Sequence, residues 1–194
     1  AGRKVKIVFE DDQCDPKQAV SVANRVVANG VKFVAGHACS GSSIPASDVY
    51  NENGVLMMSP ASSAPALTDK GHATIMRIYP RDDAQASFIA PWIAKTYAGK
   101  KVAVMHDKSA YGRGLATIVR DKLTAAGLKP VLFDGLNPGE KDYTTIVAKM
   151  KSLGVDLLYF GGYHTETGLM ARQARDQGFK LKIATADALA TPEF

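Results

Sequence analysis

The stretch Asp15–Gly36, "DPKQAVSVANRVVANGVKFVAG", predicts one helix followed by one strand. Asp15 suits the N-cap of the helix, Pro16 suits its first position, and Gln18 stands where the partner in a capping box would lie. Apolar residues then recur at helical spacing, and Gly30 marks the expected left-handed stop. The helix face comprises Ala19, Val20, Ala23, Val26 and Val27, and the strand comprises Val31–Ala35.

The same unit of apolar run, polar turn, amphipathic stretch and glycine recurs along the chain. Helix-ending glycines follow one another at intervals of 24 to 28 residues, apart from one interval of 45 residues. Unbroken apolar runs follow them, as is typical of parallel strands covered on both faces. Strands alternating with helices predict an α/β fold with doubly wound parallel sheets. The glycines are Gly30, Gly54, Gly99, Gly127, Gly154 and Gly178, and the later apolar runs cover residues 55–58, 102–105, 157–160 and 183–185.

The long interval between Gly54 and Gly99 predicts a boundary between two lobes. It contains an extra strand-like run, Ala73–Pro80, that is not followed by a helix of the same unit. We therefore expect an N-terminal lobe at residues 1–80 and a second lobe at residues 81–194. The first lobe has only two whole units, and its predicted first strand, Val5–Phe9, has nothing before it. These features indicate an internal segment of a longer protein, which we expect to fold poorly when purified alone.

Composition places the chain among globular proteins. Of the 194 residues, 46% are hydrophobic and 22% are charged, which are ordinary values for a protein with a packed core. No apolar run approaches the length needed to cross a bilayer, so direct membrane insertion is not expected. The net charge is +5, but Lys and Arg are dispersed and do not alternate with aromatic residues as a nucleic-acid surface would require.

Two loops of the first lobe offer groups that bind a small anion. Ligands of parallel sheets bind beyond the carboxyl ends of the strands. The loop Gly36–Ser43, "GHACSGSS", opens a helix, and N–H groups at a helix start attract a carboxylate or a phosphate. The stretch Met58–Leu67, "MSPASSAPAL", offers hydroxyls and main-chain groups held by two prolines. Neither a phosphate-loop pattern nor a GxSxG elbow surrounds Ser40 or Ser42, which disfavours nucleotide binding and serine hydrolysis.

Three loops of the second lobe offer aromatic rings and one carboxylate. Tyr111 and Tyr163 each lie just beyond a predicted strand, and Asp187 directly follows the last one. Such a carboxylate can pair with an ammonium group, although capping of a helix is an alternative role. His106 and His164 show no spacing typical of metal ligands. Taken together, the two lobes predict binding of a zwitterion between them and not its chemical transformation.

Two cysteines, Cys14 and Cys39, lie outside any CxxC motif and have no histidine at metal-ligand spacing. Two buried thiols and one disulfide are both compatible with this pattern, and a disulfide would require an oxidising compartment. Composition alone leaves the two alternatives open.

Several motifs, in order along nearly the whole chain, resemble the periplasmic leucine/isoleucine/valine-binding proteins of ABC importers. Examples are "LMMSPASSAPALTDKG" and "HDKSAYGRGLA". The resemblance implies two doubly wound lobes of the type I periplasmic binding protein fold, with an N-terminal lobe that is incomplete in this chain. The motifs cover residues Glu10–Ser47, Leu56–Gly71, His106–Ala116, Phe133–Lys151 and Tyr159–Gly178.

In the first lobe, the resemblance implies contacts to the main-chain end of an amino acid. Ser40, at a helix start, would receive the α-carboxylate. Ala61 would offer its carbonyl to the ammonium group, and Ser63 would offer its N–H and hydroxyl to the carboxylate. Ser62 lies between them in the same ligand-binding stretch. Some relatives carry Thr in place of Ser63, a change that keeps the hydroxyl.

In the second lobe, the resemblance implies that Tyr111 and Tyr163 contact the ligand and that Asp187 pairs with the ammonium group. Relatives of the leucine type carry Glu at the position of Asp187, which is one methylene longer, so the preferred side chain is left open. The resemblance also implies a disulfide between Cys14 and Cys39.

The implied function is capture of an aliphatic or related amino acid by hinge closure, for delivery to the membrane permease of an ABC importer. The expected location is the periplasm, with no catalysis, cofactor, metal or nucleic acid. A ligand-sensing module of a receptor or regulator with the same fold is the main alternative. An amide hydrolase is a third hypothesis, which predicts turnover.

Overall fold

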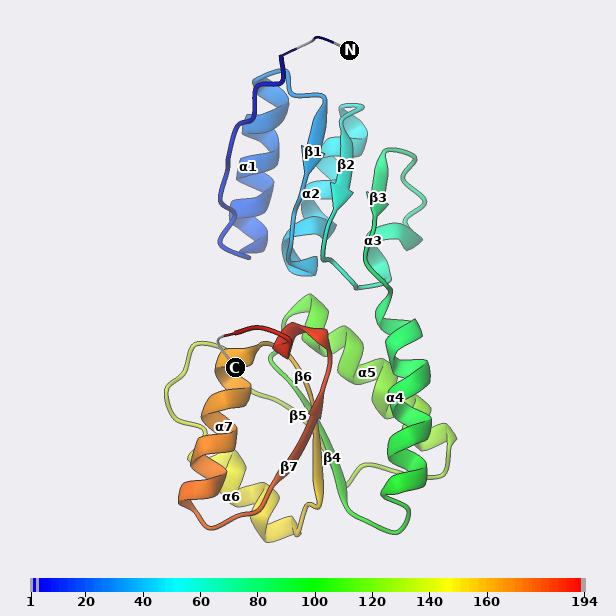
Figure 1. Cartoon of the computed structure of the whole chain (residues 1–194), viewed down its shortest axis with the longest axis vertical. Helices are drawn as coiled ribbons and strands as arrows, with labels where there is room; N and C mark the ends of the chain where they lie inside the picture. The colour runs from blue at the N-terminus through cyan, green and yellow to red at the C-terminus, as the bar shows by residue number, and fades with distance from the viewer. Residues whose placement is uncertain (1, 3, 193–194) are drawn as a thin grey trace. The chain divides into compact units, whose positions relative to one another are not determined.

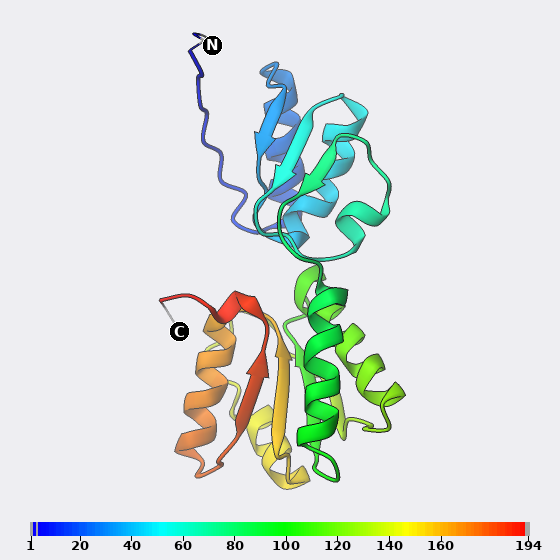
Figure 2. The ribbon, with the colours of Figure 1, turned by 45° about the vertical axis from the view of Figure 1, so that its right-hand side comes forward.

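The computed structural model describes residue 2 and residues 4–192. By internal packing the chain divides into two compact units, Ala1–Tyr79 and Pro80–Phe194. Each unit contains its own parallel sheet with flanking helices (Figures 1 and 2). The predicted α/β fold with parallel sheets is confirmed. No helix in the described part of the chain combines the length and the apolar character that a membrane span requires.

Unit 1 is a three-stranded parallel sheet in the order β1-β2-β3 (Figure 1). In the register of the sheet, Val34 lies opposite Met57, and Met57 lies opposite Ile75. Met57 and Ile75 are buried against apolar residues of the two long helices. The elements are α1 (Pro16–Ala28), β1 (Phe33–Ala35), α2 (Ser40–Glu52), β2 (Leu56–Ser59), α3 (Ala66–Asp69) and β3 (Ile75–Arg77).

The start of α1 follows the predicted capping pattern. The Asp15 side chain accepts a hydrogen bond of 2.8 Å from the backbone N–H of Gln18, and Pro16 occupies the first helical position. Gly30 ends the turn after the helix with a φ of 70°, which glycine adopts without steric cost.

A disulfide joins Cys14, just before α1, to Cys39, the N-cap of α2. The bridge implied by the family resemblance is therefore confirmed.

The predicted strand at Val5–Phe9 is wrong in this structure. These residues are assigned to no strand, and Val5 and Phe9 are 83% and 89% exposed. A strand needs backbone partners to count as part of a sheet, and no backbone hydrogen bond of the described chain involves residues 4–9. The apolar sequence is suited to a strand, but the partner that would complete it does not lie beside it.

Unit 2 is a four-stranded parallel sheet in the order β5-β4-β6-β7. The two central strands, β4 and β6, are buried along their whole length. The elements are α4 (Asp82–Thr96), β4 (Val102–His106), α5 (Ala110–Ala125), β5 (Leu132–Gly135), α6 (Thr144–Leu153), β6 (Leu157–Gly161), α7 (His164–Asp176), β7 (Lys182–Thr185) and a short 3-10 helix (Asp187–Leu189).

Helices cover both faces of the sheet in unit 2. Val102 and Val104 of β4 pack with residues of α4 and α5, such as Ile93 and Leu115. The alternate residues of β4, which point to the other face, pack with residues of α6 and α7. This doubly wound arrangement leaves the loops at the carboxyl ends of β4, β6 and β7 close together, because these strands are parallel neighbours.

Candidate functional site

The candidate site of unit 1 lies at the carboxyl ends of β1 and β2. Neighbouring parallel strands end at the same edge of a sheet, so the loop after β1 and the stretch after β2 meet there. Helix α2 begins at Ser40, and its first turn is hydrogen-bonded to that stretch through Ser40 and Ala64. Of the predicted residues, Ser40, Ser62 and Ser63 are buried at this edge, whereas Ala61 is exposed.

A cluster of serine hydroxyls fixes the main chain at this edge. The carbonyl of His37 accepts hydrogen bonds from Ser43 Oγ at 3.0 Å, from Ser59 Oγ at 2.6 Å and from Ser62 Oγ at 3.3 Å. Ser62 Oγ also lies 2.9 Å from the carbonyl of Ala38, to which it can donate. Ser62 therefore holds the two loops together through its hydroxyl, and its expected contact with a ligand stays a prediction.

Ser40 and Ser63, which we expected to contact a ligand, keep hydrogen-bonding capacity at this edge. Ser40 Oγ accepts a hydrogen bond of 3.2 Å from the N–H of Ala64, which joins the start of α2 to the stretch after β2. Its own proton stays available for an acceptor such as a carboxylate. Among the described residues, no hydrogen bond uses the N–H or the hydroxyl of Ser63. The first N–H groups of α2 add further donors, because they have no partner within the helix.

Arg77, at the end of β3, holds the same stretch from its other side. Its Nη1 donates to the carbonyls of Ser62 at 3.2 Å and Ala64 at 2.9 Å, and its Nη2 donates to the carbonyl of Pro65 at 3.3 Å. The planar, five-donor guanidinium can bind several carbonyls at fixed angles, which an ammonium group cannot do. Our sequence reasoning missed Arg77. A charged residue inside the apolar run of β3 was the signal that could have revealed it.

The candidate site of unit 2 brings together the three residues predicted from its loops. Tyr111 lies in the first turn of α5, Tyr163 is the N-cap of α7, and Asp187 begins the 3-10 helix after β7. The two tyrosine rings are 5.4 Å apart between centroids. The Tyr111 hydroxyl lies 3.5 Å from Asp187 Oδ1 and donates to it.

The tyrosines of this site stay protonated at physiological pH. Burial, followed by the nearby charge of Asp187, raises the pKa of Tyr111 far above its usual value. Burial, followed by the charge of Asp107, raises the pKa of Tyr163 to about 12. Both hydroxyls are therefore neutral hydrogen-bonding groups, and Asp187 supplies the carboxylate that can meet a cation.

Two glycines allow helix α5 and strand β6 to approach each other closely. A Cβ on Gly112, in the first turn of α5, would collide with Asp107 Oδ1 and with the carbonyl of Gly161, at the end of β6. A Cβ on Gly161 would collide with the carbonyl of Gly112 in turn. Helix α5 and strand β6 thus meet backbone to backbone, directly beside Tyr111. Asp107 supports the same turn by accepting hydrogen bonds from the N–H and the hydroxyl of Ser109, at 2.9 and 2.6 Å.

Metal binding and serine activation have no support in these contacts. Within residue 2 and residues 4–192, no three His, Cys, Asp or Glu side chains form a group that could hold a metal ion. His37, the histidine nearest the serine cluster in sequence, is bonded through its ring to Asp12 and to Tyr50. The arrangement can hold a carboxylate in unit 1 and an ammonium group in unit 2.

Comparisons with known proteins give a consistent result. The sequence matches the family described as periplasmic binding protein over residues 1–193. It is 45% identical, over 99% of the chain and 52% of the relative, to a leucine-, isoleucine-, valine-, threonine- and alanine-binding protein of Pseudomonas aeruginosa. It is 46% identical, over 97% of the chain and 52% of the relative, to a Leu/Ile/Val-binding protein of Escherichia coli K12. The chain thus spans about half the length of these curated relatives.

Solved structures show the same likeness. A leucine-binding protein, LivK, from Thermotoga maritima matches with a TM-score of 0.90 at 28% identity, over 99% of this chain and 55% of that one. The substrate-binding protein LivJ of a branched-chain amino-acid transporter from Streptococcus pneumoniae, solved in complex with isoleucine, matches with a TM-score of 0.84. Its identity is 26%, over 96% of this chain and 53% of that one.

Proposed function

The chain belongs to the periplasmic binding protein family, and from that premise we propose that the complete protein captures a free aliphatic amino acid for an ABC importer. The resemblance to Leu/Ile/Val-binding proteins, first drawn from sequence motifs, is confirmed by 45% identity over 99% of the chain. Capture by closure of the two units, delivery to a membrane permease and residence in the periplasm belong to the same proposal.

The observation that carries the proposal is the chemistry of the two candidate sites. Unit 1 offers N–H donors and hydroxyls around Ser40 and Ser63, which suit a carboxylate. Unit 2 offers a carboxylate, Asp187, beside the two neutral tyrosines, which suits an ammonium group. Together these groups match the two charged ends of an α-amino acid. The printed ligands of the relatives, among them leucine and isoleucine, support an aliphatic side chain.

The contacts of the serine cluster support binding without catalysis. A hydrolase needs a serine whose proton is taken by a base. The hydroxyls of Ser43, Ser59 and Ser62 are instead engaged with the carbonyl of His37. Preorganised hydroxyls and amides of this kind hold a ligand with little loss of entropy on binding.

A thermal-shift screen of the complete protein against the twenty amino acids tests the proposal. A ligand at a hundred times its Kd stabilises the folded state by about 2.7 kcal/mol, which raises the melting temperature measurably. We expect the largest shifts with leucine, isoleucine and valine. A screen in which no amino acid shifts the melting temperature would refute the proposed function.

Replacement of Ser40 should weaken ligand binding without unfolding the protein, although the N–H of Ala64 loses its acceptor. In Ser40→Ala the carboxylate loses a hydrogen bond from a hydroxyl, and bonds to charged groups contribute about 1.5–3 kcal/mol, or roughly ten- to a hundredfold in affinity. Calorimetry measures the affinity. Ser87→Ala, at an exposed position of α4, is the control. Equal affinities of the two variants would remove Ser40 from the site.

Arg77 should act on the ligand through the main chain that it holds. Arg77→Lys keeps the charge but loses the fork that binds three carbonyls, so we expect about a tenfold loss of affinity. Faster amide exchange at Ser62 and Ala64 should accompany it, because the N–H groups of both residues are hydrogen-bonded in this stretch. Arg172→Lys, at an exposed position of α7, serves as the control. Unchanged amide exchange at Ser62 and Ala64 would show that Arg77 does not position this stretch.

A further inference from the structure

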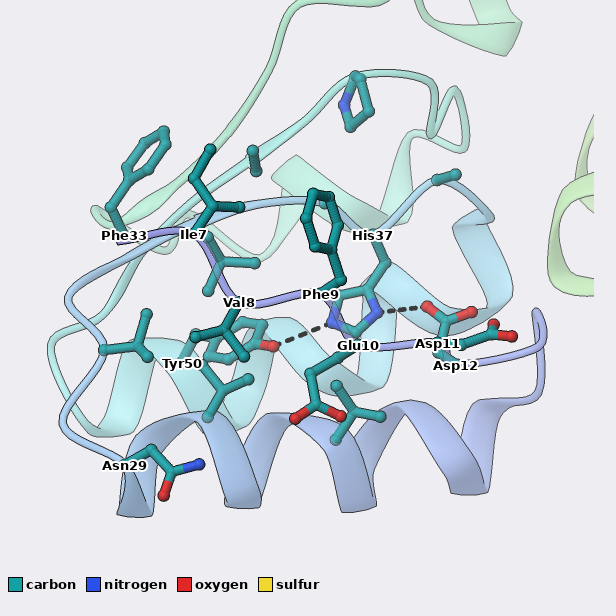
Figure 3. A pocket seen from close by; sticks show the side chains of 18 of the residues that line it. Ile7, Val8, Phe9, Glu10, Asp11, Asp12, Asn29, Phe33, His37 and Tyr50 are labelled. Carbon is teal, nitrogen blue, oxygen red and sulfur yellow. Dashed lines mark hydrogen bonds and ion pairs between the residues drawn. The ribbon is translucent and has the colours of Figure 1, made fainter. Parts of the chain in front are cut away.

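The ring of His37 is fixed between two side chains that come from different parts of unit 1. Figure 3 shows it at the wall of a cavity, bonded to Tyr50 on one side and to Asp12 on the other. His37 Nε2 lies 3.0 Å from the hydroxyl of Tyr50, which belongs to α2. Asp12 belongs to the loop before α1. The imidazole therefore joins the loop after β1, in which His37 lies, to both of these parts.

The positions of the protons in this trio follow from its chemistry. Burial, followed by the charges of Asp12 and Glu10, raises the pKa of Tyr50 to about 12, so the hydroxyl keeps its proton at physiological pH. A carboxylate can only accept a hydrogen bond, so Nδ1 of His37 donates to Asp12. Nε2 then accepts from Tyr50. A neutral imidazole with its proton on Nδ1 satisfies both contacts.

Asp12 is held in place by its own loop. Its Oδ1 accepts a hydrogen bond of 2.7 Å from the N–H of Cys14, and its carbonyl accepts one of 2.8 Å from the N–H of Asp15. Oδ2 is the atom that faces His37. The disulfide between Cys14 and Cys39 joins the same two loops, just beyond these residues in each. The loop before α1 is thus linked to the loop after β1 at two adjacent points.

The main chain of His37 holds the serine cluster together. Its carbonyl accepts the hydroxyls of Ser43 from the first turn of α2, of Ser59 from the end of β2 and of Ser62 from the stretch after β2. Ser59 extends this contact, because its Oγ accepts a hydrogen bond of 3.0 Å from the N–H of Ser62. Ser62 directly precedes Ser63 in the chain. One carbonyl therefore determines the relative positions of three segments at this edge.

We propose that His37 is a positioning residue of the amino-acid site, whose ring is held by Asp12 and Tyr50 so that its carbonyl aligns the groups that receive the carboxylate of the ligand. The inference rests on the proposed function and assigns a residue that supports it. The aligned groups are those of Ser40, in the same helical turn as Ser43, and of Ser63. Hydrogen bonds weaken steeply when they are misaligned, so a site needs such support behind the residues that touch the ligand.

Binding of leucine and leucinamide to the complete protein tests the proposal. The two ligands share the ammonium group and the side chain but differ at the carboxylate. His37→Phe keeps an aromatic ring and removes both of its hydrogen bonds. We expect leucine to bind about tenfold more weakly, since a hydrogen bond to a charged group is worth roughly ten- to a hundredfold in affinity. Leucinamide forms weaker, neutral hydrogen bonds there and should lose less than about threefold.

His72→Phe is the matched control in the same unit. The His72 ring also lies beside a carboxylate, with Nε2 at 3.0 Å from Asp48 Oδ1. Its carbonyl accepts the backbone N–H of Ile75, at 3.3 Å, in place of serine hydroxyls. The affinity of this variant for leucine should therefore stay unchanged.

Tyr50→Phe tests the same link with a smaller change and decides the outcome if His37→Phe does not fold. It keeps the buried ring and removes one hydroxyl from His37 Nε2. We expect a loss of about threefold for leucine, the value of one neutral hydrogen bond, and a smaller loss for leucinamide. Tyr143→Phe is its control, because it removes a hydroxyl that donates to the carbonyl of Asn137 at 2.7 Å in unit 2. The ratio of the two affinities should not change in this control.

The wild-type protein separates failure of this inference from failure of the proposed function. A wild-type protein that binds no leucine refutes the proposed function, and the role of His37 with it. If the wild-type protein binds leucine, a loss in the His37 and Tyr50 variants that is larger for leucine than for leucinamide supports the positioning role. Unchanged leucine affinity, or equal losses for the two ligands, would overturn that role alone.

Discussion

Replacement of Asp187 by alanine should reduce the affinity of the complete protein for its amino acid by at least about a hundredfold. Loss of one partner of a buried ion pair costs about 3–5 kcal/mol, because the other charge is left without compensation. In the proposed complex, that stranded charge is the ammonium group of the ligand. The Tyr111 hydroxyl, 3.5 Å from Asp187 Oδ1, would also lose its acceptor. Titration calorimetry measures the change.

Two further variants test whether the loss of affinity comes from the negative charge at position 187. Asp187→Glu keeps the carboxylate and should retain binding, with a change in the preferred side chain, because the group reaches one methylene further. Asp176→Ala removes an exposed carboxylate at the end of α7 and should leave the affinity unchanged. An Asp187→Ala protein that binds as tightly as the Asp176→Ala protein would refute the role of Asp187.

Replacement of Gly112 by alanine should destabilise unit 2 strongly. The new Cβ would collide with Asp107 Oδ1 and with the backbone carbonyl of Gly161, and a backbone atom cannot move aside as a flexible side chain can. Overpacking of this kind costs about 3 kcal/mol. We expect a lower melting temperature and, because Tyr111 is the neighbouring residue, weaker ligand binding as well.

The same helix provides the control. Gly114 has no heavy atom within 4 Å of where its Cβ would lie. Gly114→Ala should therefore be neutral, or stabilising by up to about 1 kcal/mol through its higher helix propensity. Thermal unfolding of the complete protein compares the two variants. Equal melting temperatures would mean that α5 and β6 do not meet in the way described.

Most of the fold could be predicted from the sequence because helix caps and turns depend on residues that are close together in the chain. The Asp15 cap, Pro16 and Gly30 act within a few residues, so they determine the bounds of α1 wherever the helix packs. The strand predicted at Val5–Phe9 failed for the opposite reason. A segment becomes a strand of a sheet only when its backbone groups pair with a neighbouring strand. The apolar pattern of a segment does not reveal whether such a neighbour lies beside it.

The candidate residues of each unit could be found because each follows a predicted strand in a parallel sheet. Tyr111, Tyr163 and Asp187 are far apart in sequence, yet they meet at one edge of unit 2. Their contact with a ligand stays a prediction, as does that of Ser40 and Ser63. Contacts that depend on tertiary packing were missed. Arg77 of β3 donates hydrogen bonds to carbonyls of the stretch after β2, such as that of Ala64. Gly112 of α5 is required because the backbone of Gly161 in β6 lies directly against it.

The central claim is that this chain carries the groups that hold both charged ends of one amino acid. Calorimetry of the complete protein with leucine, N-acetyl-leucine and leucinamide tests it most directly. Acetylation removes the ammonium charge and amidation removes the carboxylate, so we expect each to weaken binding by at least about a hundredfold relative to leucine. Blocked derivatives that bind as tightly as leucine would contradict the claim.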